Sequence, residues 1–191
     1  MKVAILAGSV RPGRQSHKVA YYLKKQLVER DIETDLIDLR KNPLPIFGTG
    51  TDSEKDSEAN IQNLNTRLDR ADAIILVTPE YHGSFSGALK NTLDYFSGEF
   101  SKKPIGVATA SAGKMGGINA STQLQHVILS LGAYPLPLKL LVPDIGNALN
   151  DSYEPQNERL RKSAHKFLDE FLWFAEAVNE KKRENYNVMI E

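Results

Sequence analysis

The chain has 191 residues, with 24 basic and 24 acidic side chains and a formal net charge of zero. This balance excludes a general electrostatic attraction to nucleic acid or to an anionic membrane surface. No cysteine is present, which excludes disulfides, cysteine-ligated zinc and iron–sulfur clusters. The length fits one ordinary domain, so we expect a single domain over residues 1–191.

Five short segments along the chain are predicted to be strands. The first is five residues long, whereas the apolar core of a secretory signal needs roughly 7–15 residues and a membrane span about 20. We therefore expect a cytoplasmic location. The first and third segments are apolar at every position, which is typical of parallel strands covered on both faces. The five predicted strands are Val3–Ala7, Glu33–Leu39, Ala73–Val77, Pro104–Ala110 and Leu136–Val142.

Apolar residues at helical spacing follow each predicted strand. These patterns predict helices over about 19–30, 61–68, 88–96, 118–131 and 160–178, the last being the longest. Between the second strand and the second helix, Asn42 to Ser57 contains two prolines and two glycines and is predicted to be a loop. Its unusual length favours a functional role for this segment.

Strands that alternate with helices predict the α/β class, with a parallel sheet covered by helices on both faces. Five strands suit the doubly wound order 2-1-3-4-5, whose topological switch point lies between the first and third strands. Ligands of such sheets bind outside the carboxyl ends of the strands at that point. We therefore expect the binding site in the loops that follow the first, third and fourth strands.

The first of these loops, residues 8–16, is rich in hydrogen-bond donors. Its hydroxyl and N–H donors belong to Ser9, Arg11, Arg14, Gln15 and Ser16. The amides that open the following helix add further donors, and the helix dipole reinforces them. The loop therefore predicts a site for a phosphate group that needs no metal ion.

Two better-known phosphate motifs do not fit this loop. Gly8 and Gly13 stand at the spacing of the Walker A motif, but Arg14 and Gln15 replace its lysine and its hydroxyl residue. The middle glycine of the dinucleotide fingerprint is also absent. A terminal monophosphate is therefore the favoured ligand.

The second loop, Thr78 to Ser86, follows the third strand and begins with a proline that restricts the backbone. The residues after it present successive amides, which suit the N and O edge of a flat heterocycle, and Tyr81 offers a ring for packing. The third loop, Ser111 to Gly117, is small and glycine-rich. We expect it to cover the other end of the same ring.

The segments 8–16, 39–47 and 79–94 resemble the NADPH-dependent FMN reductase family, which has a flavodoxin-like fold and includes quinone, azo and chromate reductases. The third segment is the most specific, with a Pro-Glu-Tyr turn at 79–81 followed by Leu-Lys-Asn at 89–91. Many family members have asparagine at the position of His82. The resemblance extends from Met1 to about Ala175.

The resemblance implies an FMN site and a set of residues for each part of the cofactor. Residues implied to hold the FMN phosphate are Ser9, Arg11, Gln15 and Ser16. Residues implied to line the isoalloxazine, largely through backbone, are Pro79, Glu80, Tyr81 and His82. Ser111 and Gly113 are implied to approach the flavin from the third loop. Family members typically form homodimers, often paired into homotetramers, with active sites at the subunit interface.

The implied activity is an oxidoreductase that passes electrons from NADPH or NADH, through FMN, to a flavin, quinone or similar small acceptor. The flavin carries the redox chemistry, so no catalytic acid or base is expected. The four histidines lack ligand-like spacing, and no metal site is expected. Two alternatives stay open, namely a flavodoxin-like electron carrier and a flavin-binding sensor without turnover. The neutral charge argues against a carrier, because carriers are usually acidic.

Overall fold

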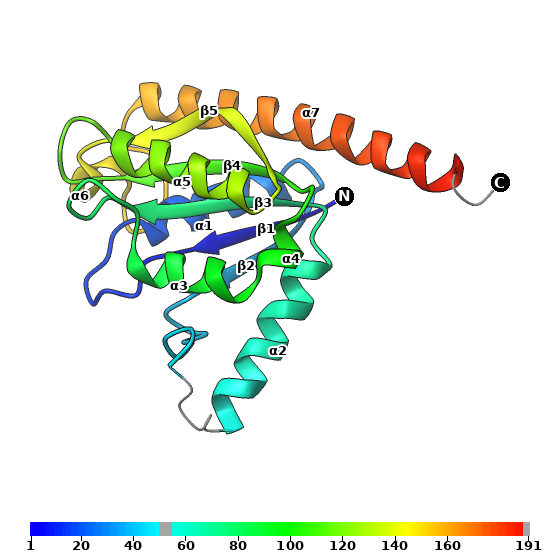
Figure 1. Cartoon of the computed structure of the whole chain (residues 1–191). Helices are drawn as coiled ribbons and strands as arrows, with labels where there is room; N and C mark the ends of the chain where they lie inside the picture. The colour runs from blue at the N-terminus through cyan, green and yellow to red at the C-terminus, as the bar shows by residue number, and fades with distance from the viewer. Residues whose placement is uncertain (50–54, 189–191) are drawn as a thin grey trace.

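The computed structural model describes residues 1–49 and 55–188 (Figure 1). Its centre is a sheet of five parallel strands in the order β2-β1-β3-β4-β5. The strands are β1 (Lys2–Ala7), β2 (Glu33–Asp38), β3 (Ala73–Pro79), β4 (Pro104–Ala110) and β5 (Tyr134–Val142). The predicted α/β class and the predicted doubly wound order are confirmed.

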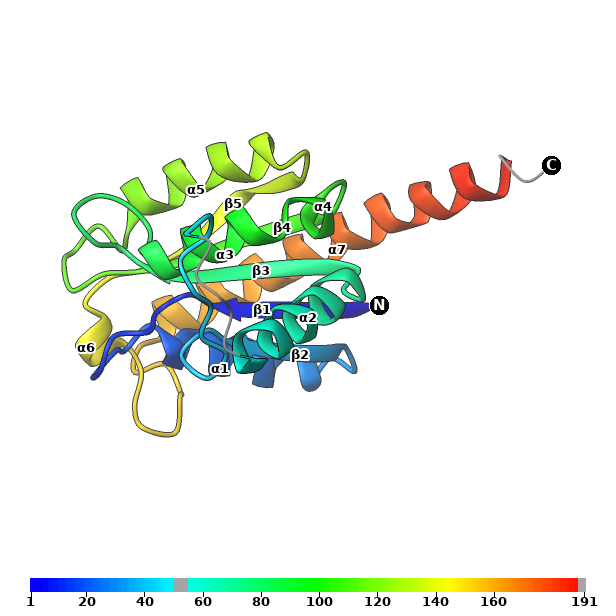
Figure 2. The same cartoon turned by 60° about the horizontal axis from the view of Figure 1, so that its bottom comes forward.

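Helices cover both faces of this sheet (Figure 2). They are α1 (His17–Val28), α2 (Lys55–Asp69), α3 (Gly87–Tyr95), α4 (Ser97–Phe100), α5 (Ile118–Ser130), α6 (Ile145–Ala148) and α7 (Glu158–Val188). Residues of α1 and α7 pack into one buried apolar cluster, and residues of α2, α3 and α5 pack into the other. The second half of α7 extends beyond the sheet (Figure 1). No helix among the described residues is long and apolar enough to cross a membrane.

Several element boundaries differ from the predicted ones. Helix α1 ends at Val28, two residues early, and is followed by a turn that contains Asp31 at a φ of 58°. Strand β5 begins at Tyr134 and contains two prolines, which an edge strand tolerates because its outer N–H groups have no neighbour to pair with. Helix α2 begins inside the predicted loop 42–57, and residues 50–54 of that loop lie outside the described residues.

The middle of β4 fixes how closely α7 packs on the sheet. Gly106 has no side chain, and a Cβ there would lie 2.8 Å from Cζ of Phe167 and 3.0 Å from Cδ2 of Phe171. Both phenylalanines are fully buried, and their rings stack with centroids 6.2 Å apart. By contrast, Trp173 of α7 is 68% exposed in this chain.

The strand register brings the predicted loops together. Ala7, at the end of β1, is paired with Asp38 of β2 and with Val77 of β3. Thr109, near the end of β4, is paired with Thr78. Because all strands run in the same direction, the loops after β1, β3 and β4 leave the same edge of the sheet.

Candidate functional site

A cavity of about 280 Å³ opens where these loops meet. Eight of the ten residues predicted for the site line it, namely Ser9, Arg11, Gln15, Ser16, Pro79, Glu80, Tyr81 and Ser111. His82 and Gly113 are not among its lining residues. We call this space the candidate flavin cavity.

Gly8, the first residue of the first loop, holds this loop against the end of β3 and against the second loop. The amide of Gly8 donates to the carbonyl of Val77 at 2.8 Å, and the hydroxyl of Ser86 donates to the carbonyl of Gly8. A Cβ at Gly8 would lie 3.0 Å from Cβ of Leu89. Glycine at this position therefore lets the loop pass close to α3.

Arg14 forms a buried ion pair that sequence reasoning missed. Its guanidinium donates to both carboxylate oxygens of Asp38, at 2.6 and 2.5 Å, and also to the carbonyl of Ser9. Only 8% of the Arg14 side chain and 4% of the Asp38 side chain are exposed. Arg14 is thus engaged within the chain and braces the first loop against the end of β2. The available signal was an acidic residue at the end of the second strand.

The pKa of Asp38 reflects this environment. Burial raises the pKa of the carboxyl, but hydrogen bonds from Arg14 and from the Arg40 amide outweigh burial, and the pKa lies below its ordinary value. The carboxylate is therefore charged at neutral pH and balances the charge of Arg14.

The Ser9 hydroxyl shares a hydrogen bond of 3.2 Å with the Tyr81 hydroxyl, and the Gln15 side chain donates to the Gly13 carbonyl at 3.3 Å, but other donors of the first loop are free for a ligand. Ser16 is 4% exposed, yet its hydroxyl has no hydrogen bond to any described residue. The Arg11 side chain is exposed, and no hydrogen bond or ion pair joins it to the described part of the chain. The amides of Gln15, Ser16 and His17 likewise have no acceptor there. Polar groups near an apolar core normally find partners, so this cluster fits an external anion.

The second loop is a tight two-residue turn. The amide of Tyr81 donates to the Ser84 carbonyl at 2.8 Å, and the reverse bond is 3.0 Å. His82 and Gly83 at the tip have φ values of 51° and 76°, which is typical of a type I′ turn. His82 therefore lies at the tip of the turn, in a backbone region that asparagine adopts more readily than most residues.

Some backbone amides of the second loop donate hydrogen bonds within the chain, and others have no acceptor there. The amide of Glu80 donates to Ala110 at 2.9 Å, and that of Tyr81 is used in the turn. The amides of His82 and Gly83 have no acceptor within the described residues. Of the amides from Glu80 to Gly83, only those of His82 and Gly83 can donate to a ligand without losing a bond.

The carboxylate of Glu80 turns inward, to a neighbouring helix of the same chain. Its Oε2 accepts a hydrogen bond from the Ala120 amide at 3.0 Å, in the first turn of α5, where a negative charge is favourable. The Gln123 side chain also donates to the Gly83 carbonyl at 3.0 Å. The second loop is therefore anchored to α5.

The third loop reaches the cavity only at its beginning. Ser111 lines the cavity, and its hydroxyl donates to the Gly113 carbonyl at 3.0 Å. Gly117 has a φ of 87°, and a Cβ there would lie 2.8 Å from Cβ of Thr109. Gly117 thus serves the close turn into α5.

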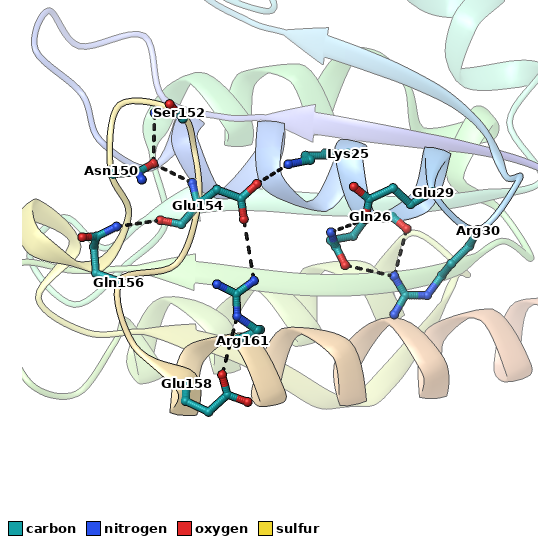
Figure 3. Close-up of polar contacts among 10 residues, drawn as sticks. All are labelled: Lys25, Gln26, Glu29, Arg30, Asn150, Ser152, Glu154, Gln156, Glu158 and Arg161. Carbon is teal, nitrogen blue, oxygen red and sulfur yellow. Dashed lines mark hydrogen bonds and ion pairs between the residues drawn. The ribbon is translucent and has the colours of Figure 1, made fainter.

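Helix α6 supplies a wall of the cavity that sequence reasoning missed. Ile145 and Gly146 line the cavity, and the Ile145 amide donates to the Ser111 carbonyl at 3.0 Å. The segment that follows α6 is fixed by Glu154, which lies between Lys25 of α1 and Arg161 of α7 (Figure 3). No motif in the sequence distinguishes this segment.

Comparisons with known proteins identify the family of the chain. Residues 1–146 match the family described as NADPH-dependent FMN reductase. The chain is 33% identical over 91% of its length to an FMN-dependent NADPH-azoreductase of Staphylococcus saprophyticus, 95% of which is covered. It is 36% identical over 74% of its length to an NADPH azoreductase of a Bacillus species, 76% of which is covered.

Solved structures share the fold. FerB, a flavoenzyme NAD(P)H:(acceptor) oxidoreductase from Paracoccus denitrificans, matches with a TM-score of 0.79 and 24% identity, over 92% of this chain and 97% of that one. A flavodoxin from Streptococcus pneumoniae matches with a TM-score of 0.60 and 13% identity, over 90% and 98%. The fold is flavodoxin-like, as predicted. With its sequence matching over most of its length, the chain belongs to the NADPH-dependent FMN reductase family.

Proposed function

We propose that this chain is an FMN-dependent oxidoreductase that takes electrons from NADPH and passes them to a small acceptor such as a quinone, a flavin or an azo compound. One observation carries the proposal. The candidate flavin cavity has a group of unpartnered donors at the start of α1, within a chain of the NADPH-dependent FMN reductase family.

The donor set suits a phosphate monoester. The hydroxyl of Ser16, the guanidinium of Arg11 and the amides at the start of α1 are free to donate. The acidic side chains nearby do not oppose an anion, because Asp38 is neutralised by Arg14 and Glu80 is bonded at the N-terminus of α5. A dianion placed here would also gain from the dipole of α1.

FMN, when bound, supplies a ring that accepts electrons from NADPH and releases them to the acceptor. The chain's own residues bind and orient it. Pro79 and Tyr81 line the cavity next to the phosphate-binding donors, and the free amides of His82 and Gly83 follow Tyr81 in the chain, outside the cavity lining. Donors fixed in a rigid turn stabilise negative charge without reorganising. No side chain is required to act as an acid or base.

We also propose that the protein is a homodimer or homotetramer in the cytoplasm. The family resemblance supports an oligomer, and the exposed Trp173 on α7 offers apolar surface for one. Sedimentation of the purified protein measures the number of subunits directly.

Spectroscopy of the purified protein tests the proposed function. We expect yellow protein, or protein that gains flavin absorbance on mixing with FMN, and loss of that absorbance when NADPH is added without oxygen. Turnover with a panel of quinones, flavins and azo compounds then defines the acceptor. Protein that binds no FMN would contradict the proposal, and bound FMN that NADPH cannot reduce would favour an electron carrier.

A further inference from the structure

A second cavity, of about 680 Å³, lies beside β5 and the start of α7. Its lining residues come from the third loop, from β5, from the segment around α6 and from the first turns of α7. We call it the basic groove and define it by Lys114, Lys139 and Arg159 together with Met115, Leu141 and Leu160. Its volume lies in the range typical of small-molecule sites, roughly 300–1,000 Å³.

The charges of the groove are not balanced. Three cationic side chains line it, and no aspartate or glutamate is among its lining residues. Lys114 and Arg159 have no hydrogen bond or ion pair with any residue that the structure describes, and Lys139 donates only to the Thr122 hydroxyl, at 3.2 Å. In a chain of zero net charge, this is a local excess of positive charge that a bound anion would offset.

The rest of the lining is partly apolar. Leu141 and Leu160 contribute apolar surface, and Met115 also lines the groove and is 64% exposed. A methionine adapts its shape to different ligands. Cations beside an apolar surface suit an organic molecule with a flat apolar body and one or two acidic groups.

The basic groove and the candidate flavin cavity share two walls. Ser111 of the third loop lines the flavin cavity, and Lys114 of the same loop lines the groove. Gly146 of α6 lines the flavin cavity, and Ala148 of the same helix lines the groove. The same short loop and the same short helix therefore border both spaces.

We infer that the basic groove binds the acidic end of a redox substrate whose reactive ring lies at the candidate flavin cavity, an inference that rests on the proposed function. The acidic group is either the 2′-phosphate of NADPH or an acid carried by the acceptor, such as an aromatic sulfonate. Lys139 and Arg159 bind it, and Lys114 adds to the positive field.

The test uses a double variant, Lys139→Gln with Arg159→Gln, in the full-length flavin-loaded protein. The matched control is Lys162→Gln with Lys166→Gln, two exposed cations of α7 that line a different cavity together with acidic residues. Values of kcat/KM are measured for NADPH and NADH with menadione, and then for menadione and anthraquinone-2-sulfonate with NADH. Binding of adenosine 2′,5′-bisphosphate and of AMP is measured by calorimetry, which requires no turnover.

In one of two substrate pairs, NADPH with NADH or anthraquinone-2-sulfonate with menadione, we expect the double variant to lose about tenfold in kcat/KM for the more acidic substrate. For the other substrate of that pair, the loss should be twofold or less. Selective loss for NADPH, with weaker binding of adenosine 2′,5′-bisphosphate, identifies the 2′-phosphate. Selective loss for anthraquinone-2-sulfonate identifies an acidic acceptor. The control variant should change neither the kcat/KM of NADPH relative to NADH nor that of anthraquinone-2-sulfonate relative to menadione.

The inference is overturned if, in the double variant, the kcat/KM of NADPH relative to NADH and that of anthraquinone-2-sulfonate relative to menadione both change by no more than about twofold, and binding of adenosine 2′,5′-bisphosphate is also unchanged. It is equally overturned if the only effect is on sedimentation, because a second copy of the chain then covers the groove. Failure of the proposed function looks different, since the wild-type protein would then hold no flavin or would not be reduced by NADPH.

Discussion

The first loop and the basic groove are both rich in cations, and the two regions use them in opposite ways. In the first loop, Arg14 is buried and paired with a carboxylate at the end of β2. In the groove, Lys114 and Arg159 have no such partner within the described chain. A cation is therefore available to a ligand only where no carboxylate within its reach already pairs with it. The number of cations in a segment does not predict this availability.

The largest expected effect comes from removing the carboxylate that pairs with Arg14. Asp38→Ala leaves a buried guanidinium without its partner, and we expect the free energy of unfolding to fall by about 3 kcal/mol. Urea denaturation measures the change. Asp94→Ala is the control, because the side chains of Lys90 and Asp94 are 48% and 38% exposed and Lys90 stays hydrated once this pair is broken, so little change is expected. An equal loss in the two variants would contradict the bracing role of Arg14.

The same pair predicts a pH dependence. The pKa of Asp38 is lower in the folded state, so its stabilising contribution is present above the pKa of an unfolded aspartate, about 4, and is lost as the pH falls through the folded value. We expect the difference in unfolding free energy between wild type and Asp38→Ala to be constant from about pH 7 to 5 and to shrink below about pH 4. A difference that already shrinks between pH 7 and 5 would show that another group is responsible.

Arg11 should behave as a ligand-binding cation, in contrast to Arg14. Arg11→Ala should weaken FMN binding by about tenfold and riboflavin binding much less, because only FMN carries a phosphate. Fluorescence titration of the flavin-free protein measures both dissociation constants. Arg40→Ala removes a nearby exposed arginine that does not line the candidate flavin cavity and is the matched control. Equal losses for FMN and riboflavin would mean that Arg11 does not contact the phosphate.

A smaller effect is expected from the hydroxyl that joins the first and second loops. Ser86 donates to the Gly8 carbonyl and caps α3 by accepting from the Leu89 amide at 3.3 Å. Ser86→Ala should lower the free energy of unfolding by about 1–2 kcal/mol. Thermal or urea denaturation measures it, and recovery of most of the loss in Ser86→Thr would identify the hydroxyl as the cause. Full stability of Ser86→Ala would show that the loops do not depend on this bond.

The smallest expected effect on stability comes from removing the unpaired cations of the basic groove. Lys139→Gln with Arg159→Gln removes charges that balance no carboxylate, so the free energy of unfolding should change by no more than about 0.5 kcal/mol. The same urea experiments measure it. A clear loss of stability would mean that these cations have a structural role, as Arg14 does.

The fold could be predicted from the sequence because its signals are local and repeated. Fully apolar strands alternate with amphipathic helices, and the chirality of the crossovers leaves few arrangements. The positions of Val3–Ala7 and Ala73–Val77 follow from that pattern alone. The first residues of β5 did not, because Pro135 and Pro137 look like strand breakers unless the strand is known to lie at the edge of the sheet.

The candidate site was predictable in outline and not in detail. The three loops follow from the sheet topology, and their donors can be read from residue types. The pairing of Arg14 with Asp38 joins residues 24 positions apart and depends on the register of β1 against β2. The contribution of α6 to the cavity wall depends on how the segment after the edge strand folds back, and no local sequence pattern predicts this path.

Gly106 has a consequence for how this sequence can vary. Its missing side chain leaves room for the rings of Phe167 and Phe171, so a methyl group there must displace one of them. Positions 106, 167 and 171 should therefore change together among relatives, with a larger residue on the strand accompanied by a smaller one on the helix. An alignment of many homologues can reveal such correlated substitutions, and a redesigned core can use the same exchange to shift α7 on the sheet.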